Sequence, residues 1–372
     1  MLLAQAPARS LLKSRVELHI HFTSTVRLET LWELMRCKNH PLPGGGTLQD
    51  LKNQVVVKEP KNLSHYLKHK KLVEETLAGD LEAIERVAFE LAEEQAKGGV
   101  LYTEARLIPR DLLPRTHSEV AEHADKEGKK GEGGQVTVDS ILRAVLKGIK
   151  RGEEHFEVKI RILLACRREY PEWAWETLRL CEEYRHEGVV GMDLSGREGQ
   201  TEEGAERLRN TVIRDVFRTA AARGIHRTVH SGEAGPASCV KYATDVLKAE
   251  RIGHGYRVLE DEEIFAKCLQ RGVHFEVCPH SSLLTGALLD PPCPRHPLMR
   301  LVEEGASFSL SSDNPLLTNS RLTQEYELVT RWGLTEADIT RANFQAALHS
   351  FLPADEKAEL IVSLKEAYGV TD

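Results

Sequence analysis

The chain has 372 residues, and its 50 Lys and Arg against 57 Asp and Glu give a formal net charge of −7. A hydrophobic fraction of 41% with 29% charged residues is typical of a globular protein and excludes a disordered or fibrous chain. No apolar run approaches the roughly 18 residues that a membrane span needs, and there is no basic cluster of the kind that binds nucleic acid. We therefore expect a cytoplasmic protein that acts on a small molecule, without a membrane or nucleic acid partner.

Eight short runs rich in Val, Ile and Leu recur along the chain and predict β-strands. They cover residues 16–21, 100–106, 159–165, 189–195, 226–232, 251–255, 273–279 and 307–313. Most lack the strict alternation of apolar and polar residues that is typical of a sheet with one solvent-exposed face. This indicates strands that are covered by helices. Helical spacing fills the segments between them, at about 80–97, 139–153, 173–187, 203–223, 236–249 and 260–271. This alternation predicts an α/β fold, a (β/α)8 TIM barrel in a single domain, over a doubly wound open sheet.

Three segments lie outside the alternation. Residues 27–78 are too long for one crossover and predict a helical insertion that forms a lid near the mouth of the barrel. Residues 117–135 include a Gly-, Lys- and Glu-rich stretch without apolar side chains, which predicts a mobile surface loop. After the last strand, helical patterns at about 323–331, 336–349 and 354–367 predict extra C-terminal helices.

His19 and His21 form an HxH pair at the end of the first predicted strand. With 16 histidines in the chain, about 0.7 such pairs are expected by chance, so the pair alone is a weak metal signal. Its position adds weight, because alternate residues of a strand share a face and barrel enzymes place their chemistry at the C-terminal ends of strands.

Three further strand ends carry similar groups: His230 with Glu233 three residues later, His254, and Asp313. Each alone is more often a satisfied hydrogen-bonding residue, but their coincidence at one end of the barrel indicates a site. Neutral imidazoles plus one carboxylate suit Zn²⁺ with an open position for water, which predicts hydrolysis. Glu233 and His254 would then carry protons.

Residues 274–276, with Cys293 further on, imitate part of the signature of cytidine-type zinc deaminases. The match fails at the last ligand, and the first part lies inside an apolar strand. We interpret this segment as structural packing.

Several strings occur in a fixed order between about residue 15 and residue 369. They are VELHIH, HRTVHSGEAG, ERIGHGYRVLEDEE, HFEVCP, LTGA, SLSSDNPL and SFLPADEK. Together they closely resemble the adenosine deaminase family. The resemblance implies a zinc-containing TIM barrel that hydrolyses the exocyclic amine of adenosine and 2′-deoxyadenosine, giving inosine from adenosine, and ammonia.

The resemblance also implies a role for each matching residue. One zinc ion per chain is expected on His19, His21, His230 and Asp313. Glu233 matches the proton donor to purine N1, and His254 the residue that holds and deprotonates the attacking water. The expected substrate contacts are His21, Thr23, Gly196 and Asn314, with the backbone N–H of Gly196 on purine N3. A tight turn after the strand is the other interpretation of Gly196.

The chain departs from the family pattern in three places. Thr23 replaces an aspartate that accepts a hydrogen bond from the ribose, and Asn314 replaces an aspartate that contacts purine N7. Asn314 can donate to N7, or can serve as a turn residue before proline. In the lid segment 63–72, His69, Lys70 and Lys71 place charge where the family is aromatic. They form either a solvated helix face or a lid that attracts an anion such as a 5′-phosphate.

Two alternatives to an adenosine deaminase therefore stay open. One is a deaminase of N6-substituted or 5′-phosphorylated adenine nucleotides, and the other is a binding protein that has lost catalysis on the same barrel. For all three we expect a monomer that binds a small-molecule purine.

Overall fold

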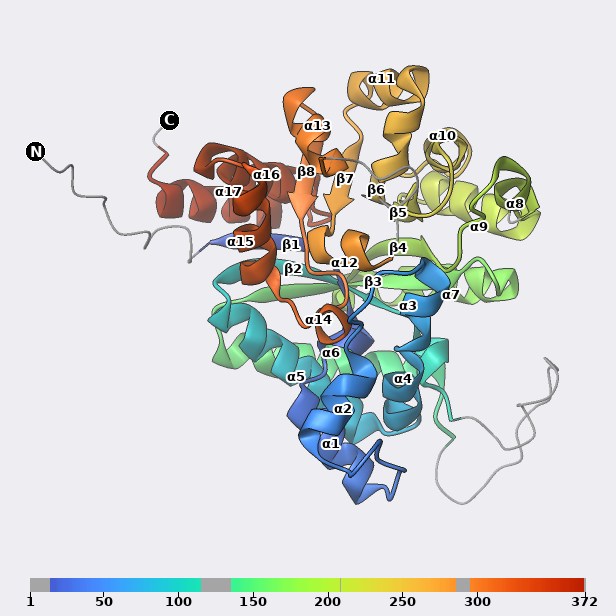
Figure 1. The fold of residues 1–372 in the computed structure, drawn as a ribbon, viewed down its shortest axis with the longest axis vertical. Helices are drawn as coiled ribbons and strands as arrows, with labels where there is room; N and C mark the ends of the chain where they lie inside the picture. The colour runs from blue at the N-terminus through green and yellow to red at the C-terminus, as the bar shows by residue number, and fades with distance from the viewer. Residues whose placement is uncertain (1–13, 115–134, 208, 286–294, 371–372) are drawn as a thin grey trace, which may run out of the picture.

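A closed set of parallel strands forms the centre of the computed structural model, which describes residues 14–114, 135–207, 209–285 and 295–370. Each strand pairs in parallel with the next, in the order β1 to β8 (Figure 1). The strands are β1 Arg15–His21, β2 Val100–Leu107, β3 Lys159–Arg167, β4 Val189–Ser195, β5 His226–Ser231, β6 Arg251–His254, β7 His274–Val277 and β8 Ser307–Leu310. The predicted TIM barrel is confirmed.

The barrel closes between its first strand and the segment that follows its last. Ile20 and Asp313 form an isolated parallel bridge. The N–H of Asp313 donates to the carbonyl of His19 at 3.0 Å, and the N–H of His21 donates to the carbonyl of Asp313 at 2.8 Å. The predicted eighth strand, 307–313, is thus too long, because β8 ends at Leu310 and Asp313 has a left-handed φ of 58°.

Charged side chains occupy the interior of the barrel. Arg106 of β2 and Arg251 of β6 both donate to the carboxylate of Glu276 on β7. Because β2 and β7 are not neighbours, the Arg106 contact must cross the barrel. All seven residues of β1 and all four of β6 are buried, which explains why these strands lack strict alternation.

Helices follow the strands as predicted, with boundaries that differ locally. The helices that cover the barrel are α5 Leu81–Lys97, α6 Val138–His155, α7 Ala174–Glu183, α8 Glu202–Arg207, α9 Thr211–Ala222, α10 Ala237–Asp245, α11 Glu262–Gln270, α12 Pro279–Leu284 and α13 Pro297–Glu303. The prediction of one helix over 203–223 is wrong. Asn210 separates α8 from α9, because its side-chain oxygen accepts from the N–H of Val212 at 2.7 Å and caps α9.

The segment 27–78 is helical, as predicted. It contains α1 Leu28–Cys37, α2 Leu48–Val55, α3 Leu63–Lys68 and α4 Lys71–Leu77, and α1, α2 and α4 gather at the lower end of Figure 1. The predicted mobile loop at 117–135 falls almost wholly on residues 115–134, which lie outside the described chain.

The C-terminal helices cover the closure of the barrel. After the short α14 Pro315–Thr318 come α15 Leu322–Trp332, α16 Glu336–His349 and α17 Ala354–Tyr368, close to the predicted positions. Helix α16 contacts both β1 and β8, and Ala346 and Leu364 pack with Val16 in a separate small core. In the described residues, no helix combines the length and apolar character required to cross a membrane.

Candidate active site

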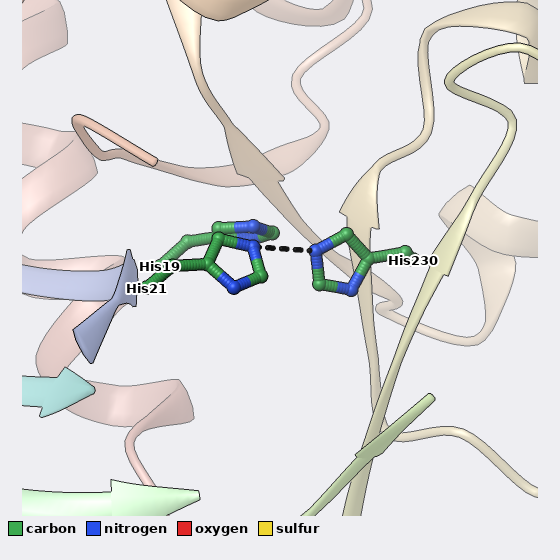
Figure 2. A group of neighbouring side chains, drawn as sticks. All are labelled: His19, His21 and His230. Carbon is green, nitrogen blue, oxygen red and sulfur yellow. Dashed lines mark hydrogen bonds between the residues drawn. The ribbon is translucent and has the colours of Figure 1, made fainter. Parts of the chain in front are cut away.

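Three imidazoles and one carboxylate meet at the C-terminal end of the barrel. Figure 2 shows His19 and His21 reaching from β1 toward His230 on β5. The Nε2 atoms of His21 and His230 lie 3.2 Å apart. Oδ1 of Asp313 lies 3.2 Å from Nε2 of His21 and 3.5 Å from Nε2 of His19. The structure therefore brings together all four predicted metal ligands.

This cluster is suited to a metal ion. The three imidazoles offer nitrogen atoms that all lie within 4.8 Å of one another, and ligands about 2.0 to 2.2 Å from one zinc ion lie roughly 3 to 3.5 Å apart. Nε2 of His19 is buried and has no hydrogen-bond partner within the described chain. A buried nitrogen left unpaired costs free energy, and a cation at the cluster would satisfy it.

A second grouping, of His19, His254 and Cys278, shares one member with the cluster. Burial raises the pKa of the Cys278 thiol well above its ordinary value. Metal ions bind the thiolate form, so this grouping is the poorer candidate.

Two buried carboxylates orient His19 and His230 through contacts with their Nδ1 atoms. Oε2 of Glu276 lies 2.7 Å from Nδ1 of His19, and Oδ1 of Asp193 lies 3.1 Å from Nδ1 of His230. Burial raises the pKa of Glu276, but Arg106 and Arg251 outweigh it and hold the pKa well below its usual range. An ionised carboxylate on Nδ1 fixes the tautomer in which Nε2 carries the free lone pair.

Hydrogen bonds hold both carboxylate oxygens of Asp313. The hydroxyl of Ser281 donates to its Oδ2 at 2.5 Å, and the amide of Asn314 donates to its Oδ1 at 2.7 Å. The hydroxyl of Ser24 donates to the amide oxygen of Asn314 at 2.8 Å, which fixes the orientation of that amide. Asp313 and His254 both have φ values near 60°, a conformation that costs a non-glycine residue about 1 to 2 kcal/mol.

Glu233 and His254 lie next to the cluster. Their Oε2 and Nε2 atoms are 3.7 Å apart, and Nδ1 of His254 is buried without a hydrogen-bond partner in the described residues. Burial raises the pKa of Glu233 well above its ordinary value, and the charges of Asp313 and Glu198 add to this effect. The neutral carboxylic acid form of Glu233 is therefore favoured, and this form can donate a proton.

The carboxylate of Glu198 holds the loop that carries Glu233. It accepts from the backbone N–H groups of the four consecutive residues 232–235, at 3.0 Å each. Such charge-assisted hydrogen bonds are stronger than neutral ones. Glu198 thus fixes the backbone at Glu233.

A pocket of about 460 Å³ contains these groups. Its lining includes His21, His230, Glu233, His254, Asp313, Asn314 and Gly196. Gly196 has a φ of 94°, and a Cβ atom there would lie 2.1 Å from Oε2 of Glu169. This residue therefore both makes a tight turn after β4 and lines the pocket. Thr23 is buried in the turn after β1 and is not among the residues that line the pocket.

Helix α3 and the residues after it form another wall of the pocket, with Leu63, Tyr66, Leu67 and Lys70. Only 7% of Lys70 is exposed, whereas 67% of the Lys71 side chain is exposed. The two lysines therefore differ: Lys71 is on a solvated face, and Lys70 is a buried cation of the pocket.

Our sequence reasoning missed three carboxylates of this site, Glu276, Asp193 and Glu198. The interpretation of 274–276 as packing holds for Phe275, which is fully buried, but is incomplete for Glu276. Acidic residues inside otherwise apolar strands, such as VHFEVCP and VVGMDLS, were the available signal, because a buried charge needs a partner.

Comparison with known proteins establishes the family to which the chain belongs. The family model described as adenosine deaminase matches residues 14–367. The chain belongs to the adenosine deaminase family. The members of this family are hydrolases that act on C–N bonds. The adenosine deaminase of Gallus gallus is 40% identical over 357 residues, with 96% of each chain covered, and that of Bos taurus is 39% identical over 369 residues, covering 99% of this chain and 97% of the relative.

A crystal structure of the N6-mAMP deaminase of Arabidopsis has the same fold as this family member. Its TM-score is 0.77 at 24% identity, and the match covers 95% of this chain and 98% of that chain. At this identity the likeness establishes the barrel architecture alone.

Proposed function

We propose that this protein is a zinc-dependent hydrolase that deaminates adenosine and 2′-deoxyadenosine to inosine and 2′-deoxyinosine, with release of ammonia. The observation that carries the proposal is the position of Glu233 and His254 beside the His–Asp cluster in one pocket. An acid, a base and a metal site that converge on one space are the groups that hydrolysis of a ring amidine requires.

The residues that would hold zinc are His19, His21, His230 and Asp313, since three neutral imidazoles and one carboxylate are ligands that Zn²⁺ favours. When bound, zinc supplies the positive charge that makes water acidic enough to attack near neutral pH. Glu276 and Asp193 keep the imidazole nitrogens turned toward that ion.

Glu233 and His254 divide the proton transfers between them. Glu233, whose neutral form is favoured by burial, donates to purine N1, which makes C6 more electrophilic. The unpaired Nδ1 and the Nε2 beside Glu233 leave His254 free to accept a proton from the attacking water. The oxygen of water bonds to C6, and the bond from C6 to the amino nitrogen breaks. One hydrogen of water leaves with ammonia, and the other replaces the proton that Glu233 gave to N1, which the product keeps.

The substrate contacts are part of the same proposal. One N–H of the Asn314 amide donates to Asp313, so the other is available to purine N7. Gly196 lines the pocket and offers its N–H to N3. The contact of Thr23 with the ribose stays a prediction. We also propose that the segment 27–78 serves as the lid of one continuous domain, since α3 lines the pocket.

Metal analysis combined with an ammonia-release assay tests this function. We expect one zinc per chain, and ammonia from both adenosine and 2′-deoxyadenosine in proportion to the zinc content. Loss of ammonia release on chelation and its return with added zinc would support the proposal. A fully zinc-loaded protein that releases no ammonia from these nucleosides would refute it, and purine binding without turnover would then favour the binding protein.

A further inference from the structure

Lys70 is a buried cation without a partner. It lies between α3 and α4, lines the pocket and is 7% exposed. Its ammonium group makes no hydrogen bond or ion pair with the residues that the structure describes. Burial lowers its pKa, and Glu74 acts in the opposite direction. Lysine is rarely buried in this way unless it is paired, so the free group indicates a missing anion.

Arg167, at the end of β3, is the second cation of the pocket lining. Its guanidinium pairs with Glu74 at 3.1 Å and with Asp111. Burial, followed by the charge of Glu74, raises the pKa of Asp111 to about 6. Glu74 and Asp111 also attract Lys70 electrostatically, but among the described residues both bond Arg167 and neither bonds the Lys70 ammonium group.

A metal ion at the cluster would add positive charge to the pocket. Asp313 is the single anionic group of the cluster, and burial favours the neutral form of Glu233. A divalent cation there leaves the pocket net positive, with Lys70 close enough to influence His21 electrostatically. An anionic group on the bound substrate would offset both charges.

From this charge pattern we propose that Lys70 and Arg167 form an anion subsite for a phosphate on the sugar of the substrate, and that the protein deaminates adenosine 5′-monophosphate in preference to adenosine. This inference rests on the proposed function, because Glu233 and His254 take the reacting edge of the purine and leave the sugar to the rest of the pocket. The reaction balances as before: AMP and water give inosine 5′-monophosphate (IMP) and ammonia.

Turnover by the zinc-loaded full chain is the first test. We expect kcat/KM for AMP to exceed that for adenosine by at least about tenfold, the effect of one charge-assisted contact. Lys70→Gln should reduce the ratio of the two values about tenfold or more, chiefly through KM for AMP. The matched control is Lys71→Gln, the exposed neighbour that pairs with Glu75 at 3.6 Å, and it should leave the ratio unchanged.

Binding of the two products separates this inference from the proposed function. Calorimetry should show that IMP binds more tightly than inosine, and that Lys70→Gln removes most of the difference. If adenosine is deaminated and inosine binds, but IMP binds no more tightly and AMP has no advantage, the anion subsite is refuted and the proposed function stands. If neither purine binds and no ammonia forms, the proposed function itself fails. A thermal unfolding midpoint of Lys70→Gln at or above that of the parent protein verifies that the variant is folded.

Discussion

Nδ1 of His19 lies 2.7 Å from Oε2 of Glu276, on the opposite side of the imidazole from Asp313. Glu276 is itself ionised and fixed by Arg106, Arg251 and Thr228. The histidine is thus held in one orientation and one tautomer by a carboxylate that does not touch the metal position. The affinity of the cluster for zinc should depend on this contact.

Glu276→Gln should weaken zinc binding by about tenfold to a hundredfold, because the amide is a poorer partner for Nδ1 and for two guanidinium groups. Competition with a chelator measures the affinity, and activity should return with excess zinc. Glu104→Gln is the matched control: Glu104 is buried and bonds Arg251 at 2.6 Å without touching the cluster. Equal zinc affinity in the two variants would contradict the assigned role.

Glu233→Gln should lower kcat by at least about a hundredfold, since general acid catalysis is removed while the shape is kept. The zinc content should not change, which mass spectrometry of the native protein can establish. Glu263→Gln serves as control, because this glutamate is exposed on α11 and pairs only with Lys267 among the described residues. Normal turnover in Glu233→Gln would rule out its role as acid.

Glu198→Gln should reduce kcat/KM by about tenfold, the effect of losing charge-assisted bonds to the loop that carries Glu233. The pH profile gives a second readout. The negative charge of Glu198 helps to raise the pKa of Glu233, so its removal should move the alkaline loss of activity to lower pH. Glu202→Gln, at an exposed glutamate that accepts a hydrogen bond from Ser238, should leave the profile in place. An unshifted profile in Glu198→Gln would show that this residue acts on the fold alone.

Stability should fall in acid because of His296. Burial lowers the pKa of His296 from 6.5 to about 3, while its Nδ1 caps α13 by accepting from Leu298. Since the folded pKa is depressed, the contribution of neutral His296 is complete above about pH 6.5 and is lost as the pH falls toward 3.

The size of this effect can be measured by urea unfolding. The unfolding free energy of the parent protein should drop by about 3 kcal/mol more between pH 6.5 and pH 4 than that of His296→Asn. Asparagine retains a capping oxygen but does not titrate. His186→Asn, at an exposed position, should behave like the parent. Identical pH dependence in all three proteins would contradict the burial effect.

The sequence was sufficient to predict that the residues at the strand ends lie close together. His19, His21, His230 and Asp313 could be predicted to converge, because the ends of parallel strands meet at one edge and the strand positions were visible. The resemblance to the family supplied their roles, which composition and spacing alone did not determine.

Contacts across the barrel could not be predicted from the sequence. Whether Glu276 faces His19 depends on the registers and tilt of β7 and β1, which no local pattern records. Lys70 and Lys71 are adjacent in one helical segment, yet the junction of α3 and α4 buries one and exposes the other. The interruption at Asn210 depended on a single side-chain cap within an otherwise continuous helical pattern.

Asp313 joins two tasks in one residue. Its backbone completes the ring of strands against His19 and His21, and its side chain enters the cluster. Efforts to re-engineer the metal preference of this protein should therefore vary His230, whose backbone forms no such seam, and keep position 313 as aspartate or asparagine, which tolerate a left-handed φ. Any bulkier choice there would disturb the architecture and the chemistry at once.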